Sequence, residues 1–303
     1  MEILDEATWT ARRAAHEQRV DLWLAPHLAR RRDGVAHPVE DFLFTYYSHS
    51  PGALRRWHPG FDVALEGGDE YAGLRGYEVV ISTGSTRRST SSTIRLATVS
   101  REYVGSRRAL LTEVRDLLAA TASHPAQLGC FGMHEWAMVY GQDEVRHPAW
   151  PLRLGRAGTD RVVERHRIAC SHFDAYRFFT PAARPLNVLS PRRDDRTAFE
   201  QPGCLHAGMD LYKHAYRLSP MVSSELVADC FELARDIRVL DMRASPYDLT
   251  GLGYSPVAVE TVPGKQEYVD AQRGFAERGA PLRERLVAEC DRLLAACEDG
   301  RQR

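Results

Sequence analysis

Apolar side chains recur every three to four residues along much of this chain, which is the spacing that one face of an α-helix requires. Two shorter stretches carry β-branched or alternating apolar residues and predict strands at 77–81 and 166–173. The helical spacing predicts helices over residues 5–32, 38–47, 101–122, 209–218, 223–240 and 281–297. We therefore expect a mainly α fold, a single helical domain with a few short strands.

The length of the chain leaves two domain arrangements to consider. A chain of 303 residues is long enough for one large domain or two modest ones. Residues 141–165 are polar and contain prolines, which makes them the one possible internal boundary. We expect residues 1–303 to form a single domain.

The overall composition is that of an ordinary globular protein, with 44% hydrophobic and 27% charged residues. No window offers the roughly 18 apolar residues that a membrane-spanning helix needs. The first residues are acidic and then polar, without the basic and apolar regions of a secretion signal. The sequence therefore predicts a cytoplasmic protein without a membrane partner, and it gives no indication of the oligomeric state.

The net charge of −1 bears on nucleic-acid binding. A protein that grips long duplex DNA usually carries a basic surplus, because neutralising phosphates drives that binding. Arginine pairs are nevertheless scattered along the chain, for example at 55–56 and 107–108. We therefore expect the partner to be a small-molecule nucleotide, or DNA touched only by a local contact.

The stretch 166–249 contains two pairs of the form Cys-x-His, Cys170 with His172 and Cys204 with His206. Cysteine and histidine are ligands that zinc and iron accept. The spacing does not match a zinc finger or ribbon, which would use Cys-x2-Cys or similar. These four residues are one candidate set of metal ligands, for Zn or Fe. The plain alternative is two buried cysteines beside hydrogen-bonded histidines.

Carboxylates follow both pairs. Alternation along an extended segment would place Asp174 on the same face as His172. If a helix begins near residue 205, His206 and Asp210 share a face at i, i+4, with Lys213 nearby. This arrangement gives a second candidate ligand set, His172, His206 and Asp210, or acid–base chemistry without a metal.

One further pair, His134-Glu135, resembles the start of a His-Glu-x-x-His zinc helix. The second histidine of that motif is absent, so we do not expect a zinc site of that type here. Helix 223–240 has its apolar face on residues such as Leu226, Cys230 and Ile237. We expect the nearby Asp241 to face solvent.

Three segments together resemble a bacterial family commonly labelled 3-methyladenine DNA glycosylase. The segments are HPVEDFLFTYYSHSPGALRRWHPG (37–60), SHFDAYRFFTPAARPLN (171–187) and CLHAGMDLYKHAYRLSPMVSSELVADCFELARDIRVLDMRASPYDL (204–249). The resemblance covers most of the chain. It implies an N-glycosidase that releases a modified base.

We carry three hypotheses for the function. The first is a hydrolase, an N-glycosidase that releases a modified purine-like base from DNA or a nucleotide and needs a carboxylate and an aromatic slot. The second is a metal-dependent enzyme with a Cys/His/Asp site, and the third is a non-catalytic small-molecule or nucleotide-binding protein. The candidate catalytic residues are Asp174, Asp210, His172 and His206, and the candidate substrate-binding residues are Phe173, Tyr176, Arg177, Phe178 and Lys213.

Overall fold

The structure is a computed structural model that describes residues 1–85, 91–142 and 149–299. The fold is mainly α, as the sequence predicts, with 59% of the chain in helices and 8% in strands. The helices are α1 (Glu6–Arg32), α2 (Phe42–Tyr46), α3 (Pro51–Arg55), α4 (Arg101–Ser106), α5 (Arg108–Ser123), α6 (Met133–Ala137), α7 (Gly155–Arg165), α8 (Phe173–Tyr176), α9 (Arg196–Phe199), α10 (Leu205–Arg217), α11 (Ser224–Arg243) and α12 (Val262–Asp299).

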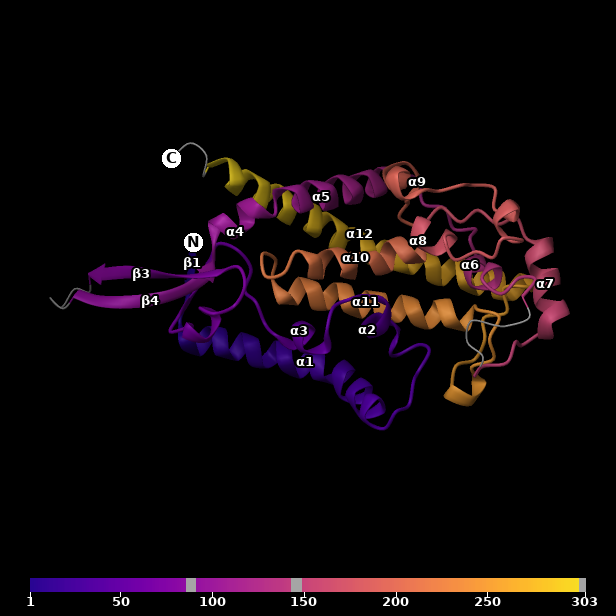
Figure 1. The fold of residues 1–303 in the computed structure, drawn as a ribbon, viewed down its shortest axis with the longest axis horizontal. Helices are drawn as coiled ribbons and strands as arrows, with labels where there is room; N and C mark the ends of the chain where they lie inside the picture. Colours follow the sequence, from indigo (N-terminus) through magenta and orange to yellow (C-terminus); the bar gives the residue numbers. More distant parts are fainter. Residues whose placement is uncertain (86–90, 143–148, 300–303) are drawn as a thin grey trace.

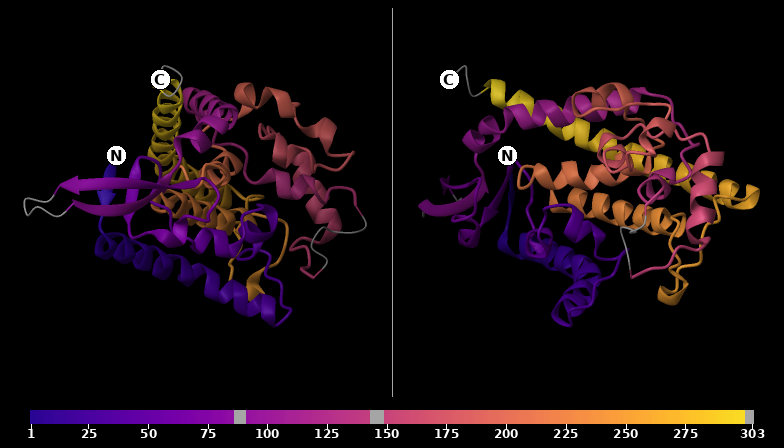
Figure 2. Two further views of the ribbon diagram at one scale, coloured as in Figure 1. Left: turned by 60° about the vertical axis from the view of Figure 1, so that its left-hand side comes forward. Right: turned by 45° about the vertical axis from the view of Figure 1, so that its right-hand side comes forward.

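Helices α10, α11 and α12 run side by side through the middle of the molecule (Figures 1 and 2). Helix α5 packs along α12, and α1 lies on the opposite side against α3 and α11. These helices share one large hydrophobic cluster that includes Val20, Leu111, Leu211 and Leu233. The polar site described below lies where α6, α8 and α9 cover the same bundle.

Capping side chains explain where two of the long helices begin. The Asp5 carboxylate accepts a hydrogen bond from the Thr8 amide at 2.7 Å, before α1. The Ser223 hydroxyl accepts one from the Leu226 amide at 3.4 Å, before α11. Both helices therefore begin one residue after the predicted starts at 5 and 223, because the first predicted residue is the N-cap.

The strands β1 (Glu2–Leu4), β2 (Val63–Glu66), β3 (Tyr77–Ser85) and β4 (Ser91–Val99) form one sheet in the order β1-β2-β4-β3. Strand β1 pairs with β2 in parallel, and the other neighbours are antiparallel. The long β3–β4 pair extends away from the helices (Figure 1). The strand predicted at 77–81 is confirmed as the first part of β3.

The strand predicted at 166–173 is wrong. This segment makes a single bridge, between Ile168 and Asn187. The Asn187 side chain takes the place of a neighbouring strand: it accepts from the Cys170 amide at 2.7 Å and donates to the Cys170 carbonyl at 3.0 Å. With these backbone groups satisfied by one side chain, the segment needs no ladder, and α8 begins at Phe173.

The possible domain boundary at 141–165 is described only in part, because residues 143–148 lie outside the described ranges. Its later part is α7, and Val162 and Val163 of that helix belong to the large hydrophobic cluster. Among the described helices, none is long and apolar enough to cross a membrane.

Candidate functional site

A layer of buried polar side chains lies along one face of α10. His206, Asp210 and His214 are spaced at i, i+4 and i+8, so they project from the same side of the helix. All three are buried, and Asp210 is only 2% exposed. Because buried polar groups are costly without partners, this face of α10 needs polar neighbours from the segments that cover it.

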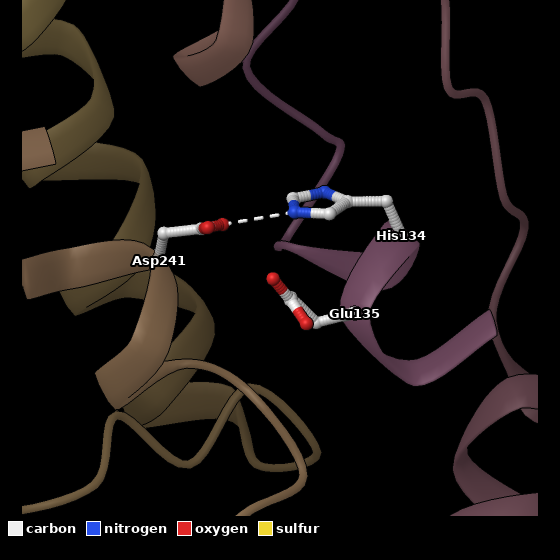
Figure 3. A group of neighbouring side chains, drawn as sticks. All are labelled: His134, Glu135 and Asp241. Atoms are coloured by element: carbon white, nitrogen blue, oxygen red, sulfur yellow. Dashed lines mark ion pairs between the residues drawn. The ribbon is translucent and has the colours of Figure 1, made fainter. Parts of the chain in front are cut away.

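Helices α6 and α11 place His134, Glu135 and Asp241 beside this layer (Figure 3). Each offers one ligand atom that lies within 4.8 Å of the other two. The His134 Nε2 and Asp241 Oδ1 atoms are 2.9 Å apart. Among the residues that the structure describes, these three form the group of His, Cys, Asp or Glu side chains that is compact enough to hold a metal ion.

Arg238 connects the two carboxylates of this group. One guanidinium nitrogen, NH1, donates to Glu135 Oε1 at 2.9 Å and to Asp241 Oδ2 at 2.7 Å. Arg238 and Asp241 lie one turn apart on α11, and the guanidinium also lies over the Phe42 ring at 3.8 Å. Arg238 therefore holds both carboxylates in place and leaves Asp241 Oδ1 directed at His134.

The electrostatics of the group favour positive charge. Burial opposes a charge on His134, but the Asp241 carboxylate outweighs burial and raises the pKa of His134 to about 10. Burial also opposes ionisation of Asp241, yet His134 and Arg238 hold the pKa of Asp241 well below its usual value. The protonated His134 and Arg238 together therefore balance the two carboxylates of Glu135 and Asp241.

His206 separates this group from two cavities. Its ring packs edge-on against His134, with centroids 4.4 Å apart, and lies 5.3 Å from the His172 ring. His134 and His206 both line a cavity of about 670 Å³, whereas Glu135 and His206 line a smaller one of about 250 Å³. Burial, followed by the nearby His134, keeps the pKa of His206 well below its usual value. A ligand in the larger cavity would therefore lie against His134, and one in the smaller cavity against Glu135, whereas Asp241 lines neither.

Asp210, a predicted catalytic carboxylate, is enclosed by donors. It accepts hydrogen bonds from the Tyr47 hydroxyl at 2.9 Å and from Arg196 and Lys213 at 3.1 Å each. His172 Nε2 lies 3.5 Å from Asp210 Oδ2, so the predicted neighbours of Asp210 do meet. Asp210 lines none of the three cavities of about 670, 250 and 550 Å³ around the site, which makes it a structural anion in this geometry.

Asp174 and Lys213 form an ion pair at 3.0 Å, and Arg177 pairs with Asp174 at 3.2 Å. Burial opposes ionisation of Asp174, but Lys213 outweighs burial and lowers the Asp174 pKa. Asp174 lines the 250 Å³ cavity and a neighbouring cavity of about 550 Å³ on the far side of Lys213. Of the predicted carboxylates, Asp174 is therefore the one that faces open space.

The predicted aromatic slot does not form. Phe173 lines the 550 Å³ cavity and Phe178 lines the 250 Å³ cavity, while Tyr176 packs against Phe179 with centroids 5.2 Å apart. The reason is that residues 173–176 form the short helix α8, which turns successive side chains in different directions. No single pocket therefore receives all three predicted rings.

The predicted metal set Cys170, His172, Cys204 and His206 is not brought together as one compact group. The Cys170 thiol lies 3.8 Å from the His172 carbonyl, and Cys204 precedes the first turn of α10. Both thiols do line the 670 Å³ cavity with His206, whereas His172 is fully buried behind it. The alternative set of His172, His206 and Asp210 is not a compact group either.

Sequence patterns do not predict the three residues that form the compact group. The zinc-helix motif at His134 and Glu135 is incomplete, and Asp241, which we expect to face solvent, is 0% exposed. The missed signal was the spacing on α11, where Asp241 follows the apolar face residue Ile237 by four positions. A carboxylate at a core position of a helix needs a buried cation or ligand.

Comparison of the chain with family models, with curated proteins and with solved structures finds no match. The resemblance to the glycosylase-labelled family therefore stays a prediction. The function has to be argued from the site itself.

Proposed function

We propose that this chain is a metal-dependent hydrolase whose ion is held by His134, Glu135 and Asp241. The observation that carries the proposal is the relation between His134 Nε2 and Asp241 Oδ1. The two atoms are buried and form an ion pair at 2.9 Å, and a divalent ion could be held there in place of the proton on His134.

The donor set fits a divalent transition metal. One imidazole and two carboxylates are a combination that zinc and iron accept. Arg238 holds the outer oxygens of both carboxylates at 2.7 and 2.9 Å, as hydrogen-bonded neighbours of metal ligands commonly do. His134 would have to release its proton to act as a neutral ligand, and the ion would replace that positive charge beside the two carboxylates.

The position of the group suits catalysis on a bound molecule. A divalent ion there would supply an activated water or polarise a substrate oxygen. His134 and His206 face the 670 Å³ cavity, which has the volume of a typical small-molecule site. His206 lies beside His134, and as a neutral imidazole it could hydrogen-bond a molecule bound in that cavity. The buried Arg238 fixes the carboxylates, so the site is rigid before substrate arrives.

The proposal is tested by the response of thermal stability to added metal. Chelator-treated protein is melted with and without Zn²⁺, Mn²⁺ or Fe²⁺, alongside the variants His134→Ala and His166→Ala. His166 lines the same cavity but is outside the group of three. One ion at about 100 times its Kd should raise the melting temperature of the parent and of His166→Ala by roughly 5 °C. No rise in the parent, or an equal rise in His134→Ala, would contradict the proposal.

The N-glycosidase hypothesis stays a prediction and takes a different form in this geometry. Because Asp210 is enclosed by Tyr47, Arg196 and Lys213, the carboxylate next to the base would be Asp174 or Glu135, which both line the 250 Å³ cavity. Release of base from alkylated DNA or modified nucleotides, measured for Asp174→Asn against the parent, tests it. Unchanged release in Asp174→Asn would exclude Asp174 as that carboxylate.

A further inference from the structure

The 670 Å³ cavity beside His134 and His206 has a lining of one charge sign. Its lining residues include Arg165, Arg167 and Lys265, and they include no aspartate or glutamate. Two further histidines, His124 and His166, also line it. Cations lining a concave wall concentrate the positive potential inside it, which draws anions in.

These three cations are available for a ligand. Arg165, Arg167 and Lys265 make no ion pair with any carboxylate of the described residues. Nearby, by contrast, Arg153 is paired with Glu260 at 2.9 Å. Arg165 ends α7, Arg167 follows it by two residues, and Lys265 is in the first turn of α12, so two segments bring positive charge to one cavity.

The same cavity has aromatic walls. Phe131 and Phe199 both line it, and the Lys265 ammonium lies 5.5 Å from the centre of the Phe131 ring. The Phe131 backbone is left-handed, with a φ of 47°, and is followed by Gly132 with a φ of 65°. A bulky residue rarely adopts this conformation, and such strain is characteristic of functional sites. Here it presents the Phe131 ring to the cavity.

We infer that this cavity binds a phosphate monoester of an aromatic, nucleoside-sized molecule. The phosphate would contact Arg165, Arg167 and Lys265, because guanidinium groups bind phosphate through paired hydrogen bonds. The ring would lie against Phe131 and Phe199, with the rest of the molecule directed at His134 and His206. The inference rests on the proposed function for the reaction, but the binding itself does not require the metal.

The test is titration calorimetry on the full chain with adenosine 5′-monophosphate, with adenosine and with inorganic phosphate. The first two probes share their ring system and differ in the phosphate. A double variant carries Arg165→Gln and Arg167→Gln together. The control variant is Arg161→Gln, because Arg161 is an exposed arginine of α7 outside the cavity lining. The monophosphate should bind at least about tenfold more tightly than adenosine, and the double variant should lose about tenfold or more of that affinity.

Two outcomes would overturn the inference. One is equal binding of the monophosphate and adenosine, or no binding of either, to the parent. The other is an equal loss in the double variant and in Arg161→Gln. Metal content measured on the same samples separates this inference from the proposed function. Phosphate-dependent binding without metal removes the metal proposal alone, and bound metal without phosphate-dependent binding removes this inference alone.

Discussion

His134 Nε2 and Asp241 Oδ1 face each other at 2.9 Å between α6 and α11 as a buried ion pair. The Asp241 carboxylate raises the pKa of His134 to about 10, so the imidazole holds a proton at this position. A metal ion bound by the two side chains would take the place of that proton, because a metal-ligating histidine is neutral. The proposed metal centre is therefore in competition with this ion pair.

Substitution of Arg238 tests how the carboxylates of Glu135 and Asp241 are held in place. Replacing Arg238 by leucine leaves Glu135 and Asp241 as buried anions without their shared partner. The free energy of unfolding should fall by about 3–5 kcal/mol. Arg235→Leu, on the same helix, removes only a partly exposed pair with Glu40 and should cost about 1 kcal/mol or less. Urea titrations of both variants make the comparison, and similar losses would contradict the role given to Arg238.

Asp210 should matter for stability more than for chemistry. Asp210→Asn weakens the contacts to Tyr47, Arg196 and Lys213 and should cost about 3 kcal/mol of unfolding free energy at pH 7. Burial opposes its ionisation, but Lys213 and His172 hold the Asp210 pKa well below its usual value. Its contribution is therefore present above about pH 4 and lost as the pH falls further.

The measurement for Asp210 is the difference in unfolding free energy between parent and Asp210→Asn at pH 7 and at pH 3. The difference should shrink at pH 3, because the unfolded parent then binds a proton at this carboxylate that the folded parent resists. Asp236→Asn, whose carboxylate makes a surface pair with Arg278, is the matched control. A difference that is the same at both pH values would contradict the charge on Asp210 as the cause.

His49 should make the protein sensitive to acid. Its ring packs against Tyr212 and Tyr216, and burial lowers the pKa of His49 from 6.5 to about 4. The folded state therefore resists a proton that the unfolded chain binds, so stability is full above pH 6.5 and falls as the pH drops towards 4. At pH 5 this loss is about 2 kcal/mol.

His49→Phe removes that proton while keeping an aromatic ring between the tyrosines. The loss of unfolding free energy between pH 8 and pH 5 should be about 2 kcal/mol smaller in the variant than in the parent. Measurement at pH 8, where the parent histidine is neutral in both states, controls for any change in packing. An equal loss on acidification in both proteins would show that His49 does not contribute.

The reactivity of the cysteine thiols tests whether Cys170 and Cys204 are buried, inert thiols. Burial raises the pKa of the Cys170 and Cys290 thiols to about 12 and that of Cys204 well above its usual value. Thiols react as thiolates, so these groups should be inert in the folded protein. Of the six cysteines, Cys130 and Cys297 are partly exposed and the rest are buried.

An aromatic disulfide reagent at pH 8 should therefore modify two thiols quickly in the native protein and all six after unfolding. The variants Cys130→Ala and Cys297→Ala should each remove one of the fast-reacting groups. Rapid native modification of Cys170 or Cys204 would show that their thiols are exposed or activated, contrary to the burial described above.

The helical part of the fold follows from the sequence because long helices with one apolar face leave a clear repeat. Helices α1, α5, α10 and α11 lie close to their predicted ranges, although the helix predicted from 101 is divided between α4 and α5. Helix α12 begins far before residue 281, where Pro281 suggested a start. A proline inside a helix looks like a first turn when the preceding residues are polar.

The site was predicted only in part, since its residues meet through tertiary packing. The local pairings were found: His206 and Asp210 share a face of α10, and Lys213 pairs with Asp210 at 3.1 Å. The group of three was missed because its members come from α6 and α11. Spacing along one segment indicates which residues share a helix face, but it does not indicate which two helices will face each other.

The most direct test of the metal centre is the metal-to-protein ratio of the purified chain. Elemental analysis gives this ratio for protein purified without added metal or chelator. The same measurement is made on Asp241→Asn and on the control variant Asp236→Asn. Asp241 is one of the three ligands, and Asp236 lies on the same helix in a surface ion pair. Our account predicts a ratio near one in the parent and in Asp236→Asn, and a ratio near zero in Asp241→Asn. A parent without metal, or an Asp241→Asn variant that retains it, would contradict the account.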